Sequence, residues 1–424
     1  MKISCFIFSI LLLAGLLAGQ TKKIVLNDPY EVFPLYYKAI ESAASNKFDL
    51  AQAQLQTVVS MVPYYHSATV FLALCDDIID GKYPKRSGLS IFNAIYNLQN
   101  GNDTLWVINT ISHQIESHGN YPYLYFIRGT IYNDLEDYPA AISDLSKVIE
   151  INPGFVTGWF FRGKVYLTIG NSEQALEDFN AALYRDPNFV PALVSTGKIQ
   201  YDNKNIEKAY KYLSQAMTLN PSYSKEFKLV EIFNAAGIHY LDKNNNPAAL
   251  EALNCALSIG TDWSEPFLNR GIAYKNLNEY LPAISDFDRS IALDSALAAA
   301  YYQRGLCFLE LKNLNQAEND LVRSTELDTG NLQYLNSLGK FYFDQRQDEK
   351  AISVFMRVLQ FDEADIWANY WIAFSYDRQK DYRNAINYYR QFILSVPNEY
   401  KNYKMRAQRR MKKIGRWLKS QSDL

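Results

Sequence analysis

The stretch Val156–Phe189, VTGWFFRGKVYLTIGNSEQALEDFNAALYRDPNF, decides the fold of the chain. Its first half places Gly163 among aromatic residues at helical spacing, and its second half does the same with Ala175. Pro187 closes the stretch. Sliding the sequence by 34 residues brings up the same pattern repeatedly, which indicates an array of similar helix pairs rather than one globular core.

The pattern is regular between Pro122 and Glu399, where eight repeats begin at positions 122, 156, 190, 230, 264, 298, 332 and 366. The eighth position of each repeat is small, and so is the matching position of each second helix. Helices with such residues can cross closely. The first set is Gly129, Gly163, Gly197, Gly237, Gly271, Gly305, Gly339 and Ala373; the second is Ala141, Ala175, Ala209, Ala249, Ala283, Ala317, Ala351 and Ala385.

These residues resemble the tetratricopeptide repeat family. The resemblance implies an all-α fold, a right-handed superhelical solenoid of tandem helix-turn-helix repeats. It also implies a non-catalytic scaffold that binds a partner protein or peptide in a concave groove. The alternative for each groove position is packing against an adjoining helix. Carried onto this sequence, the groove positions give Phe126, Phe160, Lys164, Lys198, Asn234, Tyr302, Asn336, Lys340, Tyr370 and Phe374.

Four repeats share a pair of charges. Arginine occupies the seventh position and aspartate follows sixteen residues later, whereas the other four repeats lack both residues. This joint occurrence predicts ion pairs across the helix pair, with a charged-ligand site as the alternative. The predicted structural pairs are Arg128 with Asp144, Arg162 with Asp178, Arg270 with Asp286, and Arg304 with Asp320.

The N-terminal segment has the layout of a secretory signal peptide over residues 1–19. Lys2 precedes an apolar run from Ile3 to Ala18, and polar residues follow Gly19. The run is short for a membrane span, which needs about 20 apolar residues. We expect an exported chain, periplasmic or envelope-associated if bacterial, with an uncleaved membrane anchor as the alternative.

Two regions depart from the regular register. Residues 20–121 are expected to hold divergent helical repeats, with a weak copy at 32–65 and helices near 66–80, 88–99 and 103–117. Six residues are inserted at 224–229. The insertion is interpreted as a longer loop, and the alternative is a lengthened helix that loosens the stacking of two half-arrays.

The segment 400–424 is strongly basic, with no acidic residue before Asp423, and its apolar residues recur at spacings of three and four. This pattern predicts a helix that caps the last repeat. The alternative role is contact with an acidic partner or an anionic membrane surface.

The sequence contains no recognisable catalytic site. Lys and Arg number 43 against 45 for Asp and Glu, so no overall charge favours nucleic acid. Gly158–Lys164 matches a phosphate-loop pattern, but Val165 stands where that motif needs Ser or Thr. We therefore expect no enzyme, no cofactor, no metal and no nucleic-acid partner. The alternative to a scaffold is an assembly factor attached to a membrane through the N-terminal segment or the basic helix, and no oligomeric state is specified.

Overall fold

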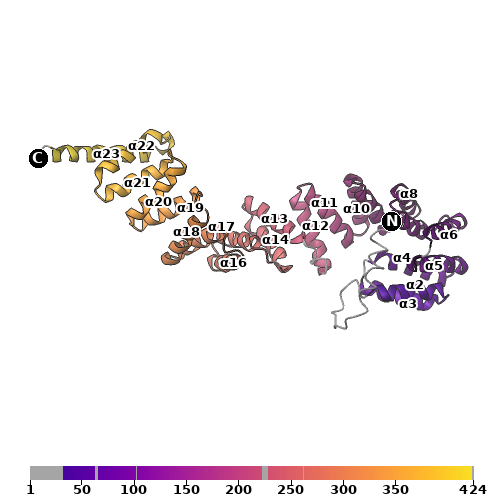
Figure 1. The fold of residues 1–424 in the computed structure, drawn as a ribbon. Helices are drawn as coiled ribbons and strands as arrows, with labels where there is room; N and C mark the ends of the chain where they lie inside the picture. The colour runs from indigo at the N-terminus through magenta and orange to yellow at the C-terminus, as the bar shows by residue number, and fades with distance from the viewer. Residues whose placement is uncertain (1–31, 63–64, 102, 222–227, 261, 423–424) are drawn as a thin grey trace. The chain divides into compact units, whose positions relative to one another are not determined.

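The computed structural model describes residues 32–62, 65–101, 103–221, 228–260 and 262–422. All regular secondary structure in these ranges is helical, and the chain divides into two compact units, unit 1 up to Leu229 and unit 2 from Val230. Within each unit consecutive helices pack against one another (Figure 1). The all-α repeat solenoid expected from the periodicity is therefore confirmed.

In the described residues of unit 1, five helices precede the regular repeats and six lie within them. The early helices lie close to their expected positions. The bounds are α2 (Phe33–Ala44), α3 (Phe48–Met61), α4 (His66–Ile79), α5 (Lys85–Gln99), α6 (Thr104–Ser117), α7 (Pro122–Asp134), α8 (Tyr138–Ile151), α9 (Val156–Thr168), α10 (Ser172–Arg185), α11 (Val190–Asp202) and α12 (Ile206–Leu219).

Unit 2 holds five further helix pairs and a long terminal helix, with one short 3-10 turn, η3 (Asn398–Tyr400), before it. The bounds are α13 (Lys228–Asp242), α14 (Asn246–Ser258), α15 (Glu265–Asn276), α16 (Tyr280–Leu293), α17 (Ala298–Glu310), α18 (Leu314–Leu327), α19 (Leu332–Asp344), α20 (Asp348–Phe361), α21 (Ile366–Arg378), α22 (Tyr382–Ser395) and α23 (Lys401–Ser422).

The turn between the two helices of each regular pair contains one residue in the left-handed region of backbone conformation. In the turn between α9 and α10 this residue is Gly170, with φ of 81°, and in the preceding pair it is Glu136, with φ of 62°. In these two turns the reversal brings Asp137 and Asn171 to the start of the next helix, where their side chains accept backbone N–H hydrogen bonds. The other turn residues are Lys204, Asn244, Asn278, Lys312, Arg346 and Lys380.

The crossing glycines meet a large apolar side chain of the second helix. A Cβ atom added to Gly271 would lie 2.5 Å from Cε1 of Phe287, a ring that is fully buried. The approach is looser at Gly305, where an added Cβ would lie 3.3 Å from Cγ of Leu321. The helix pairs therefore cross at slightly different distances. At each crossing a large side chain of the second helix packs against a glycine of the first.

Some of the sequence expectations fall on parts of the chain that the structure leaves undescribed. The expected signal peptide, residues 1–19, lies outside the described residues. So do positions 224–227 of the insertion, whereas Lys228 and Leu229 open α13. The boundary between the two units falls at this insertion.

Candidate binding pocket in the N-terminal unit

The arginine and aspartate residues singled out by the sequence form bidentate pairs. Arg162 donates from Nε and Nη2 to the carboxylate of Asp178, at 2.9 and 2.7 Å. The carboxylates of all four pairs are only 3–5% exposed, and the hydrogen bonds to them raise the pKa of the arginines. The other pairs, each with contacts of 2.7–2.8 Å, are Arg128–Asp144, Arg270–Asp286 and Arg304–Asp320.

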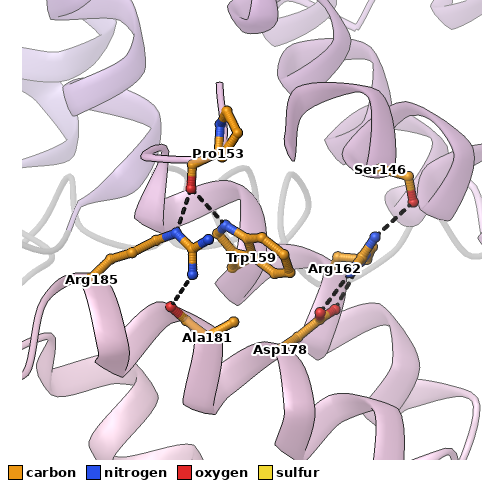
Figure 2. A network of polar contacts seen from close by, with 7 residues as sticks. All are labelled: Ser146, Pro153, Trp159, Arg162, Asp178, Ala181 and Arg185. Atoms are coloured by element: carbon orange, nitrogen blue, oxygen red, sulfur yellow. Dashed lines mark hydrogen bonds and ion pairs between the residues drawn. The ribbon is translucent and has the colours of Figure 1, made fainter. Parts of the chain in front are cut away.

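Each of these arginines also bonds a polar residue sixteen positions earlier, on the second helix of the preceding pair. Figure 2 shows Arg162 between Asp178 of α10 and Ser146 of α8, whose Oγ accepts from Nη1 at 3.0 Å. One guanidinium thus joins three helices, which favours the structural role of the pair over a charged-ligand site. This third partner was not predicted from the sequence, although it lies at the same spacing in all four repeats. The four residues are Ser112, Ser146, Asn254 and Asp288.

Five of the ten expected groove residues are buried, so their side chains pack against adjoining helices, which is the alternative given for these positions. Phe160 is enclosed by the rings of Phe161, Phe179, Phe189 and His66, at 5.4–5.7 Å. These rings come from α4, α9, α10 and the residue before α11, and they fill space around Phe160 that an open groove would leave to solvent. The five, each 2–6% exposed, are Phe126, Phe160, Asn234, Tyr302 and Tyr370.

The other five expected groove residues reach the surface. Lys164 and Phe374 are exposed, and Lys198, Asn336 and Lys340 are partly buried. The ammonium group of Lys164 lies over the rings of Phe160 and Phe161, at 5.9 and 5.3 Å from their centres. Lys164 and Phe126 both line one cavity in unit 1.

That cavity has a volume of about 310 Å³ and is bounded by α2, α4, α5, α7, α8 and α9. One wall is formed by α7 and α9, the first helices of two consecutive repeats, and we call these first helices the inner helices. The early helices form the opposite wall, because α4 begins at His66, whose ring lies 5.4 Å from those of Phe160, Phe161 and Phe189. The divergent N-terminal helices thus convert part of the inner surface of unit 1 into a pocket.

The pocket combines an apolar interior with convergent polar groups. Ile95, Leu98 and Phe126 supply apolar surface, and the phenol rings of Tyr36, Tyr37 and Tyr65 line the side formed by the N-terminal helices. Polar groups come from several helices: Ser67, Gln99, Thr130, Asn133, Asp134, Lys164 and Thr168. A concave apolar site with a few polar groups is the usual form of a ligand pocket.

The two charged residues of the pocket have perturbed protonation equilibria. Burial raises the pKa of the Asp134 carboxyl to about 6, against the pull of hydrogen bonding from Asn133 and of the nearby Lys164 charge. Burial also lowers the pKa of Lys164, against the raising effect of the Asp134 charge. Perturbed groups in a cleft are typical of functional sites.

The raised pKa of Asp134 predicts a pH effect on stability. Its folded pKa of about 6 lies above the ordinary value of 3.8, so the folded chain holds a proton more tightly than the unfolded one. The contribution of Asp134 to stability therefore falls as pH rises from about 4 to 6. We expect Asp134→Asn to gain stability relative to the wild type between these pH values, measured by urea unfolding at pH 4 and pH 7. An identical difference at both pH values would contradict this account.

Other kinds of site are not seen among the described residues. In that part of the chain no three His, Cys, Asp or Glu side chains are grouped to hold a metal ion. None of the helices in the described ranges has the length and apolar content to cross a bilayer.

Comparison with known proteins agrees with the architecture. Tetratricopeptide repeat profiles match residues 128–189, 162–224, 298–331, 332–365 and 367–399. No curated protein matches the sequence.

Several solved structures are similar to parts of this chain. YrrB, described as a tetratricopeptide repeat protein with an unusual peptide-binding site, is 18% identical, with a TM-score of 0.36 over 46% of this chain and 96% of YrrB. The Cut9–Hcn1 hetero-tetramer of the APC/C is 16% identical, with a TM-score of 0.38 over 89% and 76% of the two chains. The first repeat domain of RPAP3 bound to an HSP90 peptide is 24% identical, with a TM-score of 0.26 over 27% and 90%.

Repeat profiles match in both units, on helix pairs that follow one another at the spacing of the sequence pattern. The chain therefore contains tetratricopeptide repeats in both units.

Proposed function

We propose that the chain is a non-catalytic scaffold that binds a segment of a partner protein, and that the pocket of unit 1 receives a side chain of that segment. One observation carries the proposal. Groove positions of the inner helices, Phe126 and Lys164, converge with the tyrosines of α2 on one apolar cavity. Binding by insertion of an anchor residue suits such a cavity, because a buried side chain in a fitted pocket dominates the energy of an interface.

The size of the cavity limits what can enter. A volume of about 310 Å³ lies at the lower end of the range for ligand pockets, roughly 300–1,000 Å³. It suits one or two large side chains rather than a folded domain. The apolar wall of Ile95 and Leu98 favours an aliphatic or aromatic anchor.

Polar groups beside the cavity can hold the main chain of the segment. Gln99 and Asn133 each offer an amide that can donate and accept hydrogen bonds. Lys164 offers a donor that reaches solvent. An extended peptide supplies carbonyl and N–H groups at each residue, so these side chains suit its backbone without requiring a particular sequence.

The proposal is tested by filling the cavity. Peptides are first selected from a phage-displayed random library on the full chain, and their affinities are then measured for two variants. Thr130→Trp places an indole in the cavity, and Thr218→Trp is the matched control. Both threonines bond a carbonyl of their own helix, at 2.8 and 2.9 Å, but Thr218 lies on the exposed surface of α12.

We expect the selected peptides to share a large apolar residue. Thr130→Trp should weaken their Kd by about 30-fold or more, the effect of losing one anchor side chain, and Thr218→Trp should leave it unchanged. Equal affinity of both variants would show that the peptides bind elsewhere. Failure to select any peptide would count against the scaffold proposal as a whole.

A further inference from the structure

The terminal helix α23 has two opposite faces. On one face Ala407 and Ile414 are buried, and Met411 and Leu418 pack partly buried against the core formed with α21 and α22. This is the face expected of a capping helix. The protein itself covers this apolar stripe, so the stripe is not available for insertion into a lipid bilayer.

Specific contacts fix the rotation of α23 about its axis. Arg410 donates to both carboxylate oxygens of Asp377 on α21, at 2.6 and 2.7 Å. The ring of Trp417 lies edge-on to that of Tyr382 on α22, with centres 4.7 Å apart. The side of the helix that faces away from these contacts is therefore held toward solvent.

That outward side carries a row of cations. At 3.6 residues per turn the five positions fall within about 120° of arc and extend over about 15 Å of helix. All five side chains are exposed, and none forms an ion pair with a residue that the structure describes. They are Arg406, Arg409, Lys412, Lys413 and Arg416, and we call them the basic face.

The charge around the basic face is not balanced by neighbouring sequence. Residues 382–422 contain eleven Lys or Arg residues and one acidic residue, Glu399, whereas the whole chain carries 43 basic and 45 acidic residues. Positive charge is thus concentrated in the last two helices. A concentration of one sign on a near-neutral chain marks a surface for a polyanion.

We propose that the basic face docks on the surface of an anionic lipid bilayer. Single exposed ion pairs with a protein contribute only about 0–1 kcal/mol each and need a carboxylate opposite each cation. A bilayer offers anionic headgroups at every position along the helix, and each nearby Lys or Arg adds to the attraction.

The expected route of the chain agrees with this choice. Its N-terminal apolar run, outside the described residues, is expected to direct it to a membrane, away from nucleic acid. Because the apolar stripe of α23 packs on α22, the proposed contact is peripheral and electrostatic. It should therefore weaken steeply as salt is added.

The test is co-sedimentation of the full chain with vesicles of phosphatidylcholine alone and of phosphatidylcholine with phosphatidylserine. The variant Arg409→Glu, Lys413→Glu, Arg416→Glu reverses three charges of the basic face. The matched control, Lys312→Glu, Arg346→Glu, Lys380→Glu, makes the same charge change at exposed turn residues of unit 2. Glutamate is compatible with that turn position, because Glu136 occupies it in unit 1.

We expect the wild type and the control to bind the mixed vesicles more strongly than the neutral ones. The affinity of the basic-face variant for the mixed vesicles should be at least about 100-fold lower than that of the wild type, because each cation near such a surface contributes about a factor of five. Equal binding by variant and control would overturn the proposal. So would binding of the wild type to polyglutamate or an oligonucleotide but not to the mixed vesicles, because the partner would then be a different polyanion.

Discussion

Replacing Asp178 by alanine should lower the free energy of unfolding of unit 1 by about 3–5 kcal/mol, the cost of breaking a buried ion pair from one side. The carboxylate is 3% exposed and accepts two hydrogen bonds from Arg162. Without it, the guanidinium stays between α8, α9 and α10 with its charge uncompensated. Urea unfolding of the full chain, followed by circular dichroism, measures the loss.

A double-mutant cycle separates this effect from simple loss of packing. Arg162→Leu removes the charge and keeps apolar bulk, so Asp178→Ala combined with Arg162→Leu should be more stable than Asp178→Ala alone. Arg185→Ala is a control from the other network in Figure 2, where the exposed Arg185 lies 4.4 Å from the centre of the Trp159 ring. We expect it to cost about 1 kcal/mol or less. Additive losses in the cycle would refute the coupling.

Adding one methyl group at Gly271 should destabilise unit 2 by about 1–2 kcal/mol. Overpacking of a core costs about 1–3 kcal/mol, and the better helix propensity of alanine returns up to about 1 kcal/mol. The new Cβ would meet three ring atoms of Phe287 at 2.5–3.0 Å. A fully buried aromatic ring cannot move aside without disturbing its other contacts.

Gly305→Ala is the matched control in the same unit, because its added Cβ would meet Asp320 and Leu321 no closer than 3.2 Å. We expect its stability to stay within about 1 kcal/mol of the wild type. Phe287→Leu should reduce the cost of Gly271→Ala by making room at the crossing. Thermal unfolding of the four variants tests this, and an equal cost at both glycines would show that the crossing distance does not control the effect.

The fold could be predicted from the sequence because its signals are local and repeated. The pattern that contains Gly163 and Ala175 with their aromatic neighbours repeats at a spacing of 34 residues, and each copy predicts the same helix pair. The contact between Arg162 and Asp178 could be predicted for the same reason. Four repeats carry both the arginine and the aspartate and the other four carry neither, which indicates that the two positions interact.

The candidate site could not be predicted in the same way. Its walls join Tyr36 to Phe126 and Lys164, and no local pattern records contacts over such separations. The groove positions of the family assume inner helices with solvent in front of them. Here the bulk of Phe160 and its neighbouring rings closes part of that space, which depends on how several helices pack at once.

The three-way arginine contacts have a consequence for cooperativity. Two successive contacts share one helix, α8 in unit 1 and α16 in unit 2, so side-chain hydrogen bonds link α6 to α10 and α14 to α18 from each helix to the next. Repeat arrays open in segments whose boundaries follow the strength of nearest-neighbour coupling. These two five-helix blocks should therefore behave as foldons, the last parts of their units to lose protection while the helices outside them fray first.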